Sequence, residues 1–225
     1  MAQHTAFPLL QRLQATLTEH LPFCSGILEL PSDKFDLYYG KEDARFINLS
    51  KGADHGALAA LTQACNSKEV RVCDSCDKAG EMDPTDFITR FDVEATGLLD
   101  TVRLGLLSRA DAKRPLRAEL HKLNVYYSAH SDAVDLAGTE AQTPLSTDAP
   151  RNQSAFGSLV VVFPTQHEGG ALLLSHNDDE YTFDASRLLA ARPTSMAYLA
   201  FLSAVDHERA FVVSGHRVAL TYSLC

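Results

Sequence analysis

The sequence has few basic residues, no long apolar run and few cysteines, and each shortage excludes a class of protein. Lysine and arginine number 20 against 29 aspartates and glutamates, which gives a net charge of −9. Because phosphate binding requires a basic face, the chain is not expected to act on nucleic acid. No stretch approaches the ~20 apolar residues of a membrane-spanning helix, so no membrane partner is expected either.

The first 21 residues, MAQHTAFPLLQRLQATLTEHL, lack the basic start and the continuous apolar core of a signal peptide. A cytoplasmic or nuclear location is therefore expected, and the five cysteines are expected to be free thiols. Cys73 and Cys76 form a lone C-x-x-C motif, but the local sequence offers no second pair of zinc ligands. We interpret this motif as part of a polar loop.

Hydrophobic periodicity divides the chain into two regions at about residue 115. In residues 1–114, leucines recur at helical spacing in FPLLQRLQATL, DHGALAALTQAC and EATGLLDTVRLGLL. These amphipathic patterns predict a mostly helical N-terminal region that packs on a core. The stretch GILELPSDKFDLYYG is different, because Pro31, Ser32 and Asp33 predict the turn of a β-hairpin.

Residues 115–225 contain short apolar segments separated by turn residues. The run FGSLVVVFP is typical of a strand buried on both faces, and GGALLLSH, SMAYLAFLS and RVALTYSL follow it. No alternation of strands with helices is visible in this region, so a doubly wound parallel sheet is not expected. The spacing predicts a sandwich or barrel of short strands.

The stretch DHERAFVVSGHRVALTY, residues 206–222, contains the candidate site residues His207 and Arg217. A hairpin in this stretch would bring both residues to one end of a barrel. Two histidines and a carboxylate on one face of a metal ion are typical of non-haem Fe(II) oxygenases, and an arginine can hold a carboxylate through two hydrogen bonds. Alternation directs His216 to the opposite face from Arg217, so we interpret it as structural. His167 lies in TQHEGG, a predicted hairpin turn, and receives the same interpretation.

Several segments together resemble the Fe(II)- and 2-oxoglutarate-dependent dioxygenases, and most closely their prolyl-4-hydroxylase-like group of fungal type. The resemblance covers most of the chain and is most specific between Phe156 and Leu224. The segments that carry it are LPFCSGILELPSDKFDLYYGK, KAGEMDPTDF, KLNVY, FGSLVVVFPTQHEGGALLLSH, YTFD, AYLAFLSAVDHE and SGHRVALTYSL.

The resemblance implies an α+β protein whose double-stranded β-helix (jelly-roll) core, residues 115–225, packs against N-terminal helices. It implies Fe(II) as the metal and 2-oxoglutarate as co-substrate, and it is compatible with ascorbate. His207 would be the last metal ligand, and Arg217, ten residues later, would bind a carboxylate of 2-oxoglutarate. Tyr126 would lie beside that co-substrate or in the core. The implied reaction hydroxylates an unactivated C–H bond of a peptide or small-molecule substrate.

The first two metal ligands of such enzymes form a His-x-Asp motif, and two positions compete for it here. His130 and Asp132 have the right residue types, but His130 follows Tyr126 by only four residues. Asp148 lies at the expected distance from FGSLVVV, but Ser146 occupies the position of the histidine. A serine hydroxyl is a poor replacement for an imidazole on Fe(II). We predict His130, Asp132 and His207 as the metal ligands. The alternative register, in which Ser146 and Asp148 occupy the His-x-Asp positions, remains open.

The irregular His-x-Asp region also keeps two other functions open. One is a catalytically impaired dioxygenase-fold module that acts by binding a protein. The other is a small-molecule-binding β-barrel without iron. Iron binding distinguishes the dioxygenase from both alternatives.

Overall fold

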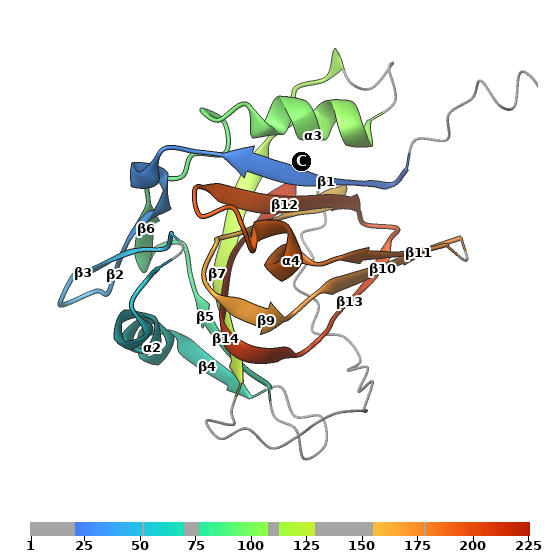
Figure 1. Ribbon diagram of the computed structural model, residues 1–225. Coiled ribbons are helices and arrows are strands. Elements are labelled where there is room, and N and C mark those ends of the chain that lie inside the picture. Colours follow the sequence, from blue (N-terminus) through green and yellow to red (C-terminus); the bar gives the residue numbers. More distant parts are fainter. Residues whose placement is uncertain (1–20, 51, 70–76, 108–112, 129–154, 178) are drawn as a thin grey trace, which may run out of the picture.

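The computed structural model describes residues 21–50, 52–69, 77–107, 113–128, 155–177 and 179–225 (Figure 1). Its strands are β1 (Phe23–Glu29), β2 (Asp36–Tyr39), β3 (Arg45–Asn48), β4 (Asn66–Glu69), β5 (Asp77–Met82), β6 (Phe87–Thr89), β7 (Ala118–Ser128), β8 (Gly157–Val162), β9 (His167–Gly169), β10 (Leu172–His176), β11 (Asp179–Phe183), β12 (Ser195–Leu202), β13 (Asp206–Arg209) and β14 (Val212–Leu224). Its helices are α2 (His55–Ala64), α3 (Leu98–Leu106), α4 (Ala185–Leu189) and the 3-10 helix η1 (Ser32–Phe35).

A large antiparallel sheet organises the fold. It has eight strands in the order β1-β12-β8-β14-β7-β5-β4, and its eighth strand, β9, pairs with the start of β14. Strand β14 is 13 residues long and pairs with both β7 and β8. All six residues of β8 are buried, which confirms the strand buried on both faces that was predicted from the run FGSLVVVFP.

A second sheet, in the order β11-β10-β13, lies against the large one (Figure 1). The chain passes from β8 in the large sheet to β10 and β11 in the second, back to β12, again to β13, and finally to β14. Such repeated passage between two antiparallel sheets is the path of a double-stranded β-helix. The predicted jelly-roll core is thus confirmed.

Alternation along the central strands separates two apolar clusters, one on each face of the large sheet. The outer cluster combines one face of β7, β8, β12 and β14 with α2, α3 and the strands β2 and β3. The inner cluster lies between the two sheets and contains Val160, Val162, Leu172, Leu174, Phe183, Ala185, Leu189, Ala197, Leu199, Phe201, Val205 and Ala219. Successive residues of a strand point to opposite faces, so β8, β12 and β14 each contribute to both clusters.

The described part of the N-terminal region contains more strand than helix, so the prediction of a mostly helical region is wrong there. Helices α2 and α3 confirm two of the predicted amphipathic segments, and Asp54 caps α2 by accepting a hydrogen bond from the Ala57 amide. However, β1 extends the large sheet beyond β12, and β5 extends it beyond β7. Strands this short are stabilised by distant partners, which local periodicity does not reveal. The third helical pattern lies in residues 1–20, outside the described residues.

The predicted hairpin around Pro31 is also wrong, although both of its strands exist. Strand β1 pairs with β12, whereas β2 pairs with β3 and β6 in a separate three-stranded sheet. The 3-10 helix η1 redirects the chain between the two sheets. The boundary proposed near residue 115 remains a prediction. Within the described ranges, no helix has the length and apolar character needed to cross a membrane.

Candidate functional site

The inward face of the large sheet carries a buried arginine beside a buried tyrosine. Arg217 on β14 and Tyr126 on β7 are cross-strand partners, and they are 0% and 2% exposed. Arg217 lies two residues before Ala219, a member of the inner cluster, so both side chains point inward. A Cβ atom at Gly170 would lie 2.8 Å from the Arg217 Cδ. The absence of a side chain at Gly170 therefore makes room for the arginine.

Strand β13 brings His207 and Arg209 to the same interior. Their cross-strand partners on β10 are Leu174 and Leu172, which belong to the inner cluster, and paired residues share a face of the sheet. The ring of His207 lies 4.7 Å from the ring of Phe201. Its Nε2 atom is buried and has no hydrogen-bond partner among the described residues. This nitrogen is therefore suited to accept a ligand contact.

The ring of Tyr126 lies beside both buried arginines. The guanidinium carbon of Arg209 lies 3.8 Å from the centre of this ring, and that of Arg217 lies 5.4 Å from it. Arg209 is 6% exposed. Both distances are within the range of a cation–π contact. Strands β7, β13 and β14 thus bring two guanidinium groups and one phenol ring to the same part of the interior.

His167 adds a neutral imidazole to this region. It lies in β9 rather than in a turn, opposite Gly215 of β14, and is buried. Its Nδ1 atom lies 2.8 Å from the carbonyl oxygen of Thr165, which can only accept, so Nδ1 carries the proton and Nε2 does not. Burial lowers the pKa of His167 to about 4; the bond to Thr165 opposes this shift and the charge of Arg217 adds to it. His167 is therefore neutral at pH 7.

The interior of the jelly roll thus has two unlike sides. We call Tyr126, His167, Arg209 and Arg217 the cationic side, and the members of the inner cluster on β8, β10, β11 and β12 the apolar side. His207 lies at their boundary, because it shares β13 with Arg209 and its ring lies beside that of Phe201. A buried cationic region bordered by a histidine and apolar side chains is suited to hold a small anion away from water.

His216 lies on the other face of the sheet, as alternation predicted. Its ring lies 5.2 Å from that of His55 in α2 and 5.8 Å from that of Tyr127. Burial, and secondarily the nearby His55, lowers the pKa of His216. This histidine therefore packs between the sheet and α2 and takes no part in the interior.

The predicted ligands His130 and Asp132 lie outside the described residues, as do the alternative pair Ser146 and Asp148. The C-x-x-C motif at residues 73–76 lies outside them too. Within the part of the chain that the structure describes, no group of three histidine, cysteine or acidic side chains is arranged to hold a metal ion. The complete ligand set remains a prediction.

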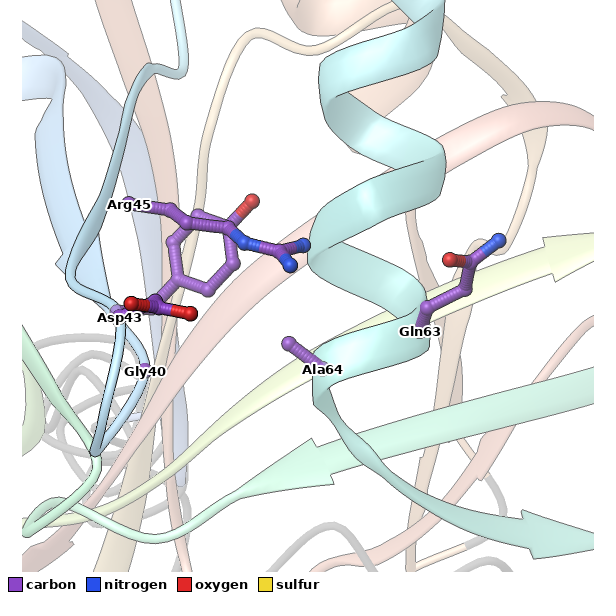
Figure 2. A pocket seen from close by; sticks show the side chains of 6 residues that line it. Gly40, Asp43, Arg45, Gln63 and Ala64 are labelled. Atoms are coloured by element: carbon purple, nitrogen blue, oxygen red, sulfur yellow. The ribbon is translucent and has the colours of Figure 1, made fainter.

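A shallow hollow of about 360 Å³ lies on the outside of the molecule, between the β2–β3 turn and the end of α2 (Figure 2). Figure 2 shows Asp43 and Arg45 directed toward this hollow, whereas Gln63 points away from them. Tyr39, Gly40 and Ala64 complete its lining. It contains none of the predicted site residues and is separated from the interior by the outer cluster, to which Tyr39 belongs.

Arg209 is not among the site residues predicted from the sequence. The signal that could have found it is its position two residues after His207, since in extended backbone this spacing directs both side chains to one face. In the sequence Arg209 follows Asp206, His207 and Glu208, and such a polar stretch is normally interpreted as exposed. Its pairing with Leu172 and its contact with Tyr126, a residue 83 positions away in the sequence, identify it as an inward-facing group.

No protein-family model and no curated protein matches the sequence. Two solved structures are similar in chain path. One is a 2OG-Fe(II) oxygenase family protein from Burkholderia pseudomallei, with 13% identity, a TM-score of 0.41, and coverage of 75% of this chain and 77% of the other. The second is a prolyl-4-hydroxylase from Pseudomonas putida, with 16% identity, a TM-score of 0.43, and coverage of 96% and 97%. Likeness at this level assigns no activity, so the functional argument rests on the residues of the interior.

Proposed function

We propose that this protein is an Fe(II)- and 2-oxoglutarate-dependent dioxygenase that hydroxylates an unactivated C–H bond of a peptide or small molecule. One observation carries the proposal: the fully buried Arg217 and the buried, unbonded Nε2 atom of His207 belong to the same jelly-roll interior. A cation and a metal-binding nitrogen in one dry space match a ligand that has a carboxylate at one end and chelates a metal at the other.

The residues fit the implied metal in part. An imidazole nitrogen that is buried and has no hydrogen bond is a suitable Fe(II) ligand, and His207 supplies one. His130 and Asp132 would complete the set of two histidines and one carboxylate; in the alternative register Asp148 would contribute beside Ser146. When bound, Fe(II) supplies the activation of dioxygen, coupled to the oxidative decarboxylation of 2-oxoglutarate to succinate and CO₂.

The protein's own residues would bind and orient the co-substrate. The guanidinium of Arg217 donates two parallel hydrogen bonds to the carboxylate remote from the metal. Because Arg217 is fully buried, this charge-assisted contact is stronger than it would be in water. Tyr126 lies alongside and can donate its hydroxyl proton to the same carboxylate. The apolar side, which includes Phe201, excludes water from the space around His207.

Anaerobic titration with Fe(II) and 2-oxoglutarate tests this function through the weak visible charge-transfer band of the metal chelate. The wild type is expected to develop the band, and His207→Ala is expected to lose it in either ligand register. His130→Ala loses it only if His130 and Asp132 bind the metal, whereas Asp148→Ala loses it only in the other register. His216→Ala is the matched control, because this buried histidine faces away from the interior, and it is expected to retain the band.

A wild-type protein that binds no iron would contradict the proposal. The impaired dioxygenase-fold module would then become the leading interpretation, and a search for protein partners would replace the substrate screen. A band that persists in His207→Ala would exclude His207 as a ligand and contradict the proposed site.

A further inference from the structure

The outer face of the large sheet carries a histidine whose ring lies close to a histidine of α2. The ring centres of His216 on β14 and His55, the first residue of α2, are 5.2 Å apart. Zinc lies about 2.0–2.1 Å from its imidazole nitrogens, so two imidazoles on one tetrahedral zinc ion have ring centres about 5 Å apart. We propose that His55 and His216 form a binding site for a divalent transition-metal ion of the zinc and copper class, separate from the predicted iron site.

His216 offers this site an imidazole nitrogen that has no other use. The residue is 7% exposed, and its Nδ1 atom is buried without a hydrogen-bond partner among the described residues. Most buried polar atoms in proteins are paired, because an unpaired one costs free energy. Burial, and secondarily the nearby His55, lowers the pKa of His216 and so favours the neutral imidazole, which is the form that binds metal ions. A metal ion shared with His55 would give this histidine its missing partner.

The fold holds the backbones of the two histidines in place. Leu58 lies three residues after His55, on the same side of α2, and is buried in the outer cluster. On the sheet, the His216 amide donates a hydrogen bond to the Gln166 carbonyl oxygen at 3.1 Å. The His55 side chain is exposed, so its ring can rotate until a nitrogen faces His216. Metal binding therefore requires a movement of one exposed side chain and no movement of the backbone.

Two imidazoles determine which metal ions fit the site. In the part of the chain that the structure describes, no third histidine, cysteine or acidic side chain joins them. The neighbouring Asp54 carboxylate instead caps α2 by accepting a hydrogen bond from the Ala57 amide. Water would complete the coordination, as at other open zinc sites. Imidazole suits zinc and copper, whereas Mn²⁺ binds most weakly in the first-row series. Zinc is therefore expected to bind here and Mn²⁺ is not.

Calorimetric titration with Zn²⁺ tests the site on the full-length chain carrying His207→Ala and Cys73→Ser. These two changes remove a ligand of the predicted iron site and break the C-x-x-C motif, both of which could take zinc. The resulting protein is expected to bind one Zn²⁺ ion at pH 7.5. Adding His55→Ala or His216→Ala is expected to weaken binding by more than about 10-fold, because loss of a ligand costs at least as much as loss of a residue that supports one.

His176→Ala is the matched control, because it removes a half-buried histidine from β10 in the second sheet. It is expected to leave the zinc affinity unchanged. His55→Ala alters an exposed residue and is expected to fold, which thermal denaturation verifies for each variant. Zinc is also expected to raise the unfolding temperature of the starting protein more than that of His55→Ala, since a ligand of the folded state stabilises it.

Three results would overturn the inference. Absence of zinc binding at millimolar concentration would make the two histidines a packing contact only. An unchanged affinity in His55→Ala would place the ion elsewhere. An affinity that stays constant from pH 7.5 to 5.5 would exclude imidazole ligands, since protons compete with the metal for their nitrogens.

The proposed function fails or stands separately from this site. In the otherwise unchanged protein, His55→Ala is expected to retain the charge-transfer band of Fe(II) and 2-oxoglutarate. The His207→Ala protein is expected to lose that band and still to bind zinc at His55 and His216.

Discussion

The two sides of the jelly-roll interior are built from adjacent strands but serve different purposes. The apolar side is filled by close-packed residues such as Phe183 and Leu199, and its burial stabilises the fold. The cationic side buries Arg209, Arg217 and the neutral His167, groups whose removal from water costs free energy. A protein that needed only stability would gain more from apolar residues there. The cationic side is the part of the interior to which the proposed function assigns a ligand.

The largest expected effect comes from the apolar side. Phe183 is 1% exposed within the inner cluster, so Phe183→Ala is expected to reduce the free energy of unfolding by about 3–5 kcal/mol. Urea denaturation measures the loss. The folded fraction of the variant is expected to bind 2-oxoglutarate normally, since Phe183 is not part of the cationic side. A loss below about 1 kcal/mol would mean that this side is not closely packed.

The next effect is the pH dependence that His167 gives to stability. Its folded pKa is about 4, below the ordinary value of 6.5, because it is buried. Between these values the unfolded state binds more protons, so stability is present above about pH 6.5 and is lost as the pH falls toward 4. This shift corresponds to roughly 3 kcal/mol. In His167→Asn, the free energy of unfolding is expected to decline less steeply as the pH falls from 7.5 to 4, as measured by urea denaturation. Parallel curves for the two proteins would contradict the assigned burial.

A smaller effect is expected at Gly170, where a substitution would affect both the stability of the fold and the position of Arg217. Its φ is +71°, and a Cβ there would lie 2.8 Å from the Arg217 Cδ and 2.9 Å from the Val212 Cγ2. Gly170→Ala is expected to cost about 1–3 kcal/mol through backbone strain and crowding. It is also expected to weaken 2-oxoglutarate binding, because Arg217 must move.

Gly97→Ala provides the control for Gly170. Gly97 has nearly the same φ, +72°, but a Cβ there would meet no atom within 4 Å. It is expected to cost about 1 kcal/mol through strain alone and to leave binding unchanged. Equal effects of the two substitutions on 2-oxoglutarate affinity would show that Gly170 does not position Arg217.

The smallest effect is expected from His216, the chain neighbour of Arg217. His216 packs against His55 and Tyr127 on the outer face, so His216→Ala is expected to cost about 1 kcal/mol of stability. The affinity for 2-oxoglutarate, measured by calorimetry, is expected to remain within twofold of the wild type. A larger loss would mean that the two faces of β14 are not independent.

Sequence patterns predicted the elements whose signal is local. The buried strand at Gly157–Val162, the helices α2 and α3, and the opposite directions of His216 and Arg217 follow from periodicity within single segments. The partners of β1 and β5 could not be predicted in this way, because those strands are defined by hydrogen bonds to distant parts of the chain. The hairpin predicted around Pro31 failed for the same reason.

The candidate site shows the same limit. Spacing and resemblance indicated His207 and Arg217, and the structure describes both in one interior. Arg209 was not predicted, since its inward direction is revealed by the contact with Tyr126 across the space between two sheets. His130 and Asp132 remain predictions, because they lie outside the described residues.

The most direct test of the account is a crystal structure of the protein with 2-oxoglutarate and Mn²⁺, which replaces Fe(II) without undergoing its oxidation. Anomalous scattering locates the metal independently of the protein atoms. The account predicts a metal peak at bonding distance from the His207 Nε2 atom and a 2-oxoglutarate carboxylate hydrogen-bonded to Arg217. A metal peak elsewhere, or an interior without 2-oxoglutarate at saturating concentration, would contradict it.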